Sequence, residues 1–352
     1  MNVLSNRSKN IENEAKPLCS VIILNYNGES IIEECLLSVL NTKYPKLEII
    51  VVDNGSTDSS CNIIKKYEPK VRLVKIPYNV GFAIGNNIGI KSSRGEYIVL
   101  LNNDTVVHPS WISNLIKIAE SDQNIGILGC KVYYMGTKIL QHAGGKIDVH
   151  STSLPHIGIF EEDVGQYDEI KDVDYVSGVS MMIRRKVIEK IGLFDPDYFL
   201  YWEDVDYCFR AKKAGFRIIY VPSAIVEHFE GFSVSKLNKY RHFVRLLFER
   251  NRILFVLKNF SSRELALFIL KDVIKQLHRA REGIARLLYR SSYYFSQRFK
   301  NDDNVISHYN WKVIQNKISF SARSIITSFI GLFYAYLFLI FKGPFIRKHR
   351  RN

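Results

Sequence analysis

Cysteine is scarce in this sequence, and its arrangement excludes the sites that cysteines usually build. The 352 residues contain five cysteines, and no two of them form a C-x-x-C pair. A zinc knuckle or a disulfide framework needs paired cysteines at short, regular spacings, so neither is indicated. A chain of this kind fits a reducing compartment best.

The N-terminus lacks the apolar core of a secretory signal peptide. Residues 1–16 are polar, and we expect them to be a loose leader on a protein made and kept on the cytosolic side. Internal repeats, a Pro-rich linker and Gln/Asn-rich runs are missing as well. With 47% hydrophobic residues, the chain is expected to fold around a sizeable core, as one or two domains.

Three widespread catalytic motifs are also missing. The sequence has no Walker loop, no G-x-G-x-x-G after the first predicted strand, and no nucleophile elbow for Ser-His-Asp catalysis. The usual nucleoside-triphosphate, dinucleotide and serine-hydrolase sites are therefore not indicated.

Acidic residues are sparse in only one part of the chain. The formal net charge is +14, yet residues 231–352 hold 24 Lys and Arg against 6 Asp and Glu, and residues 1–230 are slightly acidic. A nucleic-acid enzyme needs its positive field around the reaction site, so we expect no nucleic-acid partner. A basic tail rich in apolar and aromatic residues fits anionic lipid headgroups better.

The first third of the chain alternates strand and helix patterns. Short β-branched runs at 19–27, 47–56, 71–77 and 95–104 predict strands, with helical patterns between them. Several runs are apolar on both faces, which is typical of central strands covered by helices on each side. We predict an α/β fold with a doubly wound, mainly parallel sheet, whose ligands lie beyond the carboxyl ends of the strands. Further along, the patterns predict strands at 173–185 and 217–222 and a helix over 201–215.

Polar residues end three of these strands, at Asn25, at Asp53 and at Asn102–Asp104. We expect them to converge on one crevice. Asp104 could hold a divalent cation against a diphosphate, or it could cap a turn. Asp53 could accept hydrogen bonds from a nucleobase or ribose, or form an Asx-turn. Tyr26 could cover a base, or pack in the core.

Three other features could take part in catalysis or in ligand binding. Glu203, Asp204 and Asp206 lie among aromatic residues, where one carboxylate could become a general base, although acidic residues also suit a solvated helix start. His228 follows the last predicted strand, and a lone His is usually a surface residue or a core residue with its hydrogen bonds satisfied. The glycines around Gly81 could bring backbone amides near a phosphate, which is a weak signal.

Five motifs in order resemble the inverting glycosyltransferases of family 2, which have the GT-A fold. They are VIILNYNGES (21–30), VVDNGSTDSS (51–60), NVGFAIGNNIG (79–89), LLNNDTVVHPSWI (100–112) and the segment 177–233 that contains YWEDVDYCFRAKKAG. The sequence looks most similar to the bacterial rhamnosyltransferase and galactofuranosyltransferase type. The resemblance implies a GT-A domain over 17–235, after the leader 1–16 and before a helical region over 236–352.

The resemblance also implies roles for the site residues. Tyr26, Asp53, Gly81, Asn103 and Asp104 would bind the donor, and Asp104 with His228 would hold Mg²⁺ or Mn²⁺. The first Asp of the family's Asp-x-Asp motif is Asn102 here. Asp204 matches the catalytic base, with Glu203 supporting the acceptor site.

The implied reaction transfers a sugar from dTDP-rhamnose or a UDP-sugar to a hydroxyl of a lipid-linked glycan, with inversion, in cell-surface polysaccharide synthesis. Two alternatives stay open. One is a nucleotide-sugar-binding protein without turnover. The other is a nucleotide-sugar pyrophosphorylase, which would need a Gly-rich loop with a basic residue near the first strand; none follows Asn25.

The composition of the C-terminal residues 236–352 predicts where the reaction takes place. The uncharged run 325–341 is near the lower length limit for a membrane span, so it could span or lie on the membrane. The basic, amphipathic stretches 243–260 and 267–290 suit interfacial helices. They could equally pack on the catalytic domain or on a second subunit of a homo-oligomer. We expect the protein at the cytoplasmic face of the cell membrane.

Overall fold

A computed structural model describes residues 16–148, 154–229, 241–274, 278 and 281–282. The chain divides into two compact units. One comprises Met1–Ile147 and Ser153–Lys239, and the other Asp148–Thr152 and Tyr240–Asn352. The predicted domain boundaries after residues 16 and 235 stay predictions. Residues 1–15 of the predicted leader 1–16 and the run 325–341 lie outside the described residues.

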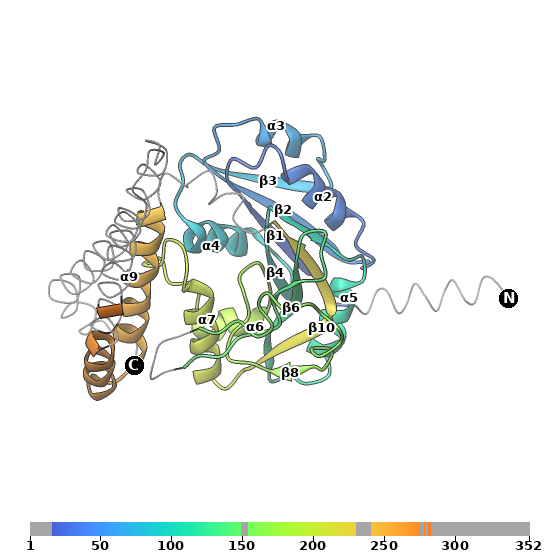
Figure 1. The fold of residues 1–352 in the computed structure, drawn as a ribbon. Helices are drawn as coiled ribbons and strands as arrows, with labels where there is room; N and C mark the ends of the chain where they lie inside the picture. Colours follow the sequence, from blue (N-terminus) through green and yellow to red (C-terminus); the bar gives the residue numbers. More distant parts are fainter. Residues whose placement is uncertain (1–15, 149–153, 230–240, 275–277, 279–280, 283–352) are drawn as a thin grey trace, which may run out of the picture. The chain divides into compact units, whose positions relative to one another are not determined.

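Four parallel strands form one half of the sheet of the first unit, in the order β3-β2-β1-β4 (Figure 1). They cover Val71–Ile76, Leu47–Asn54, Cys19–Asn25 and Tyr97–Asn102. These are the four strands predicted from the β-branched runs, each slightly shorter than predicted. Because they run parallel, their carboxyl ends meet at one edge of the sheet.

The other half of the sheet is mixed. It continues from β4 in the order β9-β6-β10-β5, with β7 on β6 and β8 on β10. These strands are β9 (Ser180–Arg184), β6 (Ile125–Tyr134), β10 (Arg217–His228), β5 (Thr105–Val107), β7 (Leu140–His142) and β8 (Lys171–Asp172). β6 and β10 run parallel, whereas β9 is antiparallel to both of its neighbours.

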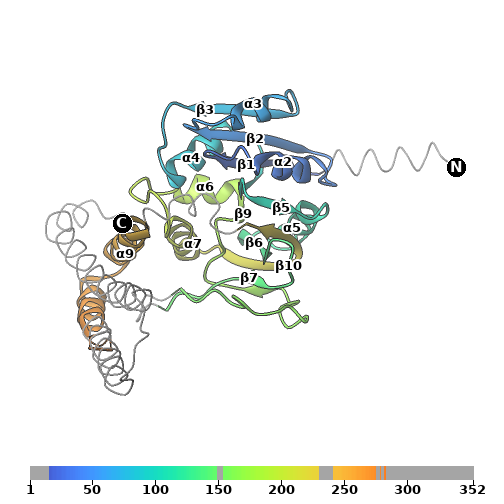
Figure 2. The same cartoon turned by 45° about the horizontal axis from the view of Figure 1, so that its top comes forward.

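Helices cover both faces of this sheet (Figures 1 and 2). α2 (Ile32–Leu40) and α5 (Trp111–Ala119) lie on one face, and α4 (Phe82–Ser92), α6 (Arg185–Ile191) and α7 (Glu203–Lys213) on the other; α3 (Ser60–Lys65) follows β2. The α/β, doubly wound prediction is therefore confirmed.

The alternation of side chains along β1 explains the two layers. Val21 and Ile23 are buried in the core cluster that contains α2. On the opposite face, Ile22 approaches α4, where a Cβ added to Gly89 would lie only 2.4 Å from Ile22 Cγ2. A strand with apolar side chains on both faces has to be covered by helices on both faces, which is why these runs fold as central strands.

Two predicted strands differ from the observed ones. The predicted strand 173–185 was too long, because only Ser180–Arg184 is strand and the chain before it turns at Ser177, whose carbonyl accepts from Ser180 N. The predicted strand 217–222 was too short. Pairing with β6 shifts register between Val221 and Ile225, around a proline that has no N–H to donate, and β10 then continues to His228.

The second unit contains α9 (Arg241–Asn259), where the amphipathic stretch 243–260 predicted a helix. Within this unit, Arg252 Nη2 donates to Asp272 Oδ1 at 2.9 Å. Among the residues that the structure describes, no helix has the length and hydropathy needed to cross a membrane.

Candidate active site

Asn25 joins the strand ends at the carboxyl edge of the sheet. Its Nδ2 donates to Asp53 Oδ1 at 3.1 Å and to Ser60 Oγ at 3.0 Å. Its Oδ1 accepts from Asn103 Nδ2 at 2.9 Å. Because Asn25 is fully buried, these bonds replace its bonds to water and tie β1, β2 and the end of β4 together. The predicted convergence of these polar strand ends is confirmed.

Asp53 and Tyr26 flank this junction. The Asp53 carboxylate is 3% exposed, and its Oδ2 accepts from Ser56 N at 3.3 Å, so the side chain also holds the turn after β2, as the Asx-turn alternative expected. Tyr26 is 38% exposed, which excludes the core alternative and leaves its ring accessible to a ligand. The roles of both residues in donor binding stay predictions.

Gly81 shapes the loop before α4. Its φ of +85° favours glycine, and an added Cβ would lie 2.5 Å from the Phe199 ring. Its N–H donates to Asn79 Oδ1 at 2.9 Å, and Phe82 N donates to Phe199 O at 2.6 Å. These two amides are thus already bonded within the protein, and Gly81 lets the loop before α4 pack on the loop before α7. Its predicted contact to the donor stays a prediction.

Asp104 and His228 form a buried pair at the same edge. Asp104 Oδ1 lies 3.0 Å from His228 Nε2, and each residue is 6% exposed. His228 lies opposite Thr105 in the β5–β10 ladder, which fixes the distance between the two side chains. His228 Nδ1 lies 2.7 Å from Gln141 Oε1.

This arrangement fits a divalent metal ion. If Nδ1–H donates to Gln141, Nε2 faces Asp104 with its lone pair, and an imidazole oriented in this way is a good metal ligand. Within the described residues, no group of three or more His, Cys, Asp or Glu side chains could hold a metal. A hard cation held by one or two protein ligands together with substrate phosphates is the usual magnesium arrangement, so two protein ligands are sufficient here.

At the start of α7, Glu203 and Asp206 are almost fully buried and Asp204 is partly buried. Glu203 is 5% exposed and Asp206 is 1% exposed, and Asp206 Oδ2 accepts from Arg210 Nε at 2.7 Å. The alternative of a solvated helix start is therefore wrong. Trp202, which precedes the helix, has a φ of +72°, and this left-handed residue turns the chain sharply into α7.

Asp204 is held by two backbone amides. Its Oδ2 accepts from Gly178 N at 2.9 Å and its Oδ1 from Val205 N at 2.8 Å. Burial raises the pKa of the Asp204 carboxyl, and the two amide bonds offset this only in part. Burial and the neighbouring Asp204 charge raise the pKa of Glu203 well above its usual range. Two adjacent carboxyl groups with raised pKa values are typical of acid–base catalysis.

Hydrogen bonds, together with neighbouring residues in the chain, connect the loops of the three predicted acidic residues. Asp53 is bonded to Asn25, and Asn25 to Asn103, the neighbour of Asp104. On the other side, Asn102 N donates to Val179 O at 3.0 Å, and the preceding residue, Gly178, holds Asp204. The structure thus brings the loops of Asp53, Asp104 and Asp204 together rather than dispersing them over separate surfaces.

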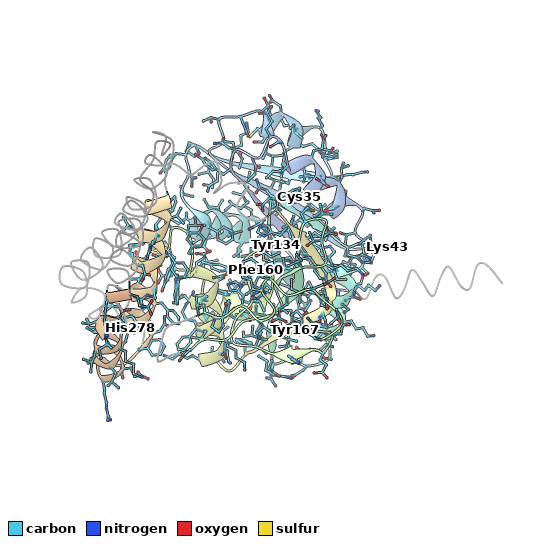
Figure 3. The ribbon with its side chains drawn as sticks, viewed as in Figure 1. Cys35, Lys43, Tyr134, Phe160, Tyr167 and His278 are labelled. Atoms are coloured by element: carbon cyan, nitrogen blue, oxygen red, sulfur yellow. The ribbon has the colours of Figure 1, made fainter. Side chains whose placement is uncertain are left out.

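An aromatic pair, in which Phe160 is exposed and Tyr134 is partly buried, lies at the His228 end of this edge. Tyr134 lies opposite His228 in the β6–β10 register. Its ring stacks on Phe160 at 5.6 Å and 8° (Figure 3), and Phe160 is 72% exposed. This pair presents an apolar surface beside the predicted metal ligand.

Sequence reasoning placed Asn25 at this edge, because it ends an apolar strand as Asp53 does, but did not assign it the role of a junction. It missed Gln141 and Gly178 as residues of the site. Gln141 and Gly178 reach the site only through antiparallel pairing and a turn, and no local pattern marks such long-range contacts.

The family model described as "Glycosyl transferase family 2" matches residues 20–192. This span contains β1, β2 and β4, whose ends carry Asp53 and Asp104. The chain belongs to glycosyltransferase family 2. Its α7, with Glu203 and Asp204, lies beyond the matched span, which ends at residue 192.

Other members of the glycosyltransferase families resemble this chain in sequence and fold. An uncharacterized glycosyltransferase of Haemophilus influenzae is 29% identical over 60% of this chain and 65% of its own length. An N-acetylglucosaminyl-diphospho-decaprenol L-rhamnosyltransferase of Mycobacterium tuberculosis is 26% identical over 61% of this chain and 77% of its own. A mannosyltransferase of Pyrobaculum calidifontis, solved with GDP-Man and Mn²⁺, has a TM-score of 0.55 at 15% identity and covers 94% of this chain and 89% of its own.

The structural likeness shows that this glycosyltransferase family 2 domain has the GT-A fold, as predicted. The chain spans less than two thirds of the length of several curated relatives, including 65% of the Haemophilus protein and 25% of a Sinorhizobium fredii protein that is 28% identical. The activity, substrates and partners of the whole protein are therefore proposed from the geometry of the site.

Proposed function

We propose that this protein transfers a sugar from a nucleoside-diphosphate sugar to a hydroxyl group of a glycan acceptor, with inversion at the anomeric carbon. The observation that carries the proposal is the set of hydrogen bonds that ties together the loops of Asp53, Asn103–Asp104 and Asp204. The first two of these loops lie within the span that the family 2 model matches. These connected loops supply acceptors for a nucleoside, a carboxylate for a metal–diphosphate complex and a general base.

The nucleoside end of the donor would lie at Asp53 and Tyr26. The Asp53 carboxylate is already oriented by Asn25 and Ser56 N, so little conformational entropy is lost when it accepts from a base or ribose. The half-exposed Tyr26 ring can stack on the base. dTDP-rhamnose and UDP-sugars are the proposed donors, and the name of the Mycobacterium relative, an L-rhamnosyltransferase, supports the first.

The diphosphate would lie at Asp104 and His228, which we propose hold Mg²⁺ or Mn²⁺. The bound ion would neutralise the charge that builds up on the leaving nucleoside diphosphate. Gln141 orients the His228 ring, and Asn103 stays bonded to Asn25. Both ligands are therefore positioned before the donor binds.

Asp204 would take the proton from the attacking acceptor hydroxyl. As the oxygen of that hydroxyl bonds to the anomeric carbon, the bond from this carbon to the diphosphate oxygen breaks on the opposite face, which inverts the configuration. The raised pKa of Asp204 makes its carboxylate a stronger base than an exposed aspartate would be. Glu203 would border the acceptor site beside it.

The acceptor is proposed to be a lipid-linked glycan, and the reaction a step of cell-surface polysaccharide synthesis at the cytoplasmic face of the membrane. The basic, apolar and aromatic composition of residues 231–352 supports this placement. The exposed Phe160 ring beside Tyr134 is a candidate contact for the acceptor.

Donor identity is best approached by thermal stabilisation with a panel of nucleotide sugars and Mn²⁺. A ligand at 100 times its dissociation constant adds about 2.7 kcal/mol to the free energy of unfolding. The stabilising donor is then incubated with acceptor, and release of nucleoside diphosphate is measured.

The Asp204→Asn variant tests the role of the base. We expect roughly 100- to 10,000-fold slower turnover with the donor's stabilising effect unchanged, because the amide of Asn cannot take the proton. The exposed Asp197 offers a matched control, since Asp197→Asn should keep normal turnover. Normal turnover by Asp204→Asn would remove Asp204 from this role. Donor binding by the wild type without any release would indicate a binding protein instead.

A further inference from the structure

The short strand β7 contributes one side chain to the metal pair and one to the turn that holds the base. Its two neighbouring residues Gln141 and His142 are 7% and 2% exposed, and successive side chains of a strand point to opposite faces. Gln141 faces His228. His142 instead contacts the imidazole of His156, with the two Nδ1 atoms 2.9 Å apart. One element thus reaches both parts of the site.

The hydrogen bonds of His142 determine its tautomer. Ser177 N lies 3.2 Å from His142 Nε2, and a backbone N–H can only donate, so Nε2 has to be the unprotonated acceptor. In the neutral ring the proton is then on Nδ1, which donates to Nδ1 of His156. A neutral His156 that accepts this bond carries its own proton on Nε2. Burial and the proximity of His156 lower the pKa of His142 well below its usual range, so its ring is neutral.

The segment that His142 holds is the one that binds the base. Ser177 N donates to His142, and the next amide, Gly178 N, donates to Asp204 Oδ2 at 2.9 Å. An added Cβ on Gly178 would lie 3.3 Å from the Phe82 ring and 3.6 Å from Asp204 Oδ2. The turn therefore has little room to shift without moving Asp204, and His142 is its side-chain anchor.

Packing around the two imidazoles keeps them in place. Their rings are 4.9 Å apart at 74°, and the buried Tyr175 ring lies 5.7 Å from each. An added Cβ on Gly145 would lie 2.1 Å from the Tyr175 ring, so glycine at this position allows Tyr175 to close over the pair. Tyr175 Oη also donates to Leu154 O at 3.1 Å, which holds the segment of His156.

We propose that His142 is a positioning residue for the base: it anchors the Ser177–Gly178 turn so that the Gly178 amide orients Asp204, and His156 fixes the tautomer in which it does so. This inference rests on the proposed function, because it assigns the orientation of a base to His142. It gives His142 no contact with either substrate.

Two isosteres separate the two hydrogen bonds of His142. The amide oxygen of Gln can reach the position of Nε2, whereas the amide of Asn reaches only that of Nδ1. His142→Gln can therefore keep the bond from Ser177, and His142→Asn keeps only the bond to His156. We expect His142→Asn to lower kcat roughly 10-fold, as for the loss of one buried hydrogen bond, with the donor KM unchanged. His142→Gln should stay within about twofold of the wild type.

A spectroscopic readout makes the test independent of turnover. Ser177–Gly178 is the only Ser–Gly dipeptide in the sequence, so the full chain labelled with ¹³C-carbonyl Ser and ¹⁵N-Gly has one correlated amide. Its proton shift reports the Gly178 bond to Asp204. We expect it to move in Asp204→Asn and in His142→Asn, and to stay in place in His142→Gln.

The two proposals fail in different ways. A Gly178 shift that is unchanged in His142→Asn, or an Nε2-protonated His142 in ¹⁵N spectra of the wild type, would overturn the positioning role even if the enzyme transfers sugar normally. A wild type that releases no nucleotide from any donor would overturn the proposed function, while the Gly178 shift would still decide whether His142 orients Asp204.

Discussion

At the scale of single residues, the buried side chain of Glu203 is in an environment that disfavours its charged form. It is 5% exposed, and within the part of the chain that the structure describes its Oε2 has no hydrogen-bond partner. Burial and the adjacent Asp204 charge raise its pKa well above the usual range. A neutral Glu203 avoids placing a second buried charge beside the base, and its proton is available for a bond to an acceptor oxygen.

The Glu203→Gln variant tests this protonation state through stability. The folded wild type retains a proton on Glu203 at pH values where the unfolded chain has lost it. Its free energy of unfolding therefore declines as the pH rises above the ordinary glutamate range. Gln cannot ionise, so we expect the variant's gain in Tm over the wild type to be larger at about pH 8 than at about pH 5. Each kcal/mol corresponds to about 2–4 °C.

Thermal unfolding at both pH values measures this gain. The exposed Glu189 on α6 provides the control, since Glu189→Gln should change Tm equally at both pH values. A gain for Glu203→Gln that is the same at both would show that Glu203 ionises as an ordinary glutamate.

At the scale of elements, an ion-pair cluster ties the loop between β7 and β8 to β6. The Lys131 side chain, 3% exposed, donates to Asp163 at 2.7 Å and to Asp168 at 2.5 Å, and Tyr133 also donates to Asp163. Burial acts to raise the pKa of Asp163, but the hydrogen bonds from Lys131 and Tyr133 outweigh it and lower this pKa to about 2. The cluster should therefore help to hold the loop that carries Phe160.

Removing Lys131 leaves two carboxylates without their cation. We expect Lys131→Met to lower the free energy of unfolding by about 3 kcal/mol, the loss typical of breaking a buried pair on one side. Urea unfolding of Lys131→Met, Asp163→Asn and the double variant measures the coupling, and the double variant should be more stable than the sum of the single losses predicts. Strictly additive losses would mean that the two residues contribute independently.

The lowered pKa of Asp163 also makes the stabilisation by this ion pair depend on pH. The unfolded carboxyl takes up its proton at a higher pH than the folded one, so the stabilisation by this pair is present above the ordinary aspartate range and is lost as the pH falls toward about 2.

At the scale of the whole molecule, charge is divided along the chain. The last 122 residues carry 24 basic and 6 acidic residues, while the part that holds the GT-A domain is slightly acidic. An acidic surface is repelled by anionic headgroups and a basic one is attracted, so the two parts are expected to respond to a membrane in opposite ways. This asymmetry supports attachment through the C-terminal region.

Vesicle sedimentation of the full chain tests this attachment. We expect binding to vesicles with anionic lipid, little binding to neutral vesicles, and release as salt rises from about 0.05 to 0.5 M, because screening shortens the range of the attraction. Replacing Arg347, Lys348, Arg350 and Arg351 by Gln should weaken binding at least about tenfold, given about 1 kcal/mol per charge. Equal binding to neutral vesicles, or retention at high salt, would favour insertion over electrostatic attachment.

The sequence by itself determined the parallel half of the sheet and the residues at its edge. Strand runs that are apolar on both faces end in Asn25, Asp53 and Asn102–Asp104, and parallel strands bring such ends together wherever the sheet forms. These signals are local, because they depend on periodicity and on where an apolar run stops.

Only the tertiary structure decided how the second half completes the site. The antiparallel insertion of β9, the continuation of β10 to His228, and the placement of Gln141, His142 and Gly178 depend on pairing between segments far apart in the chain. The free energy of such pairing comes from burial and from hydrogen bonds between distant residues, which leave no periodic trace in the sequence.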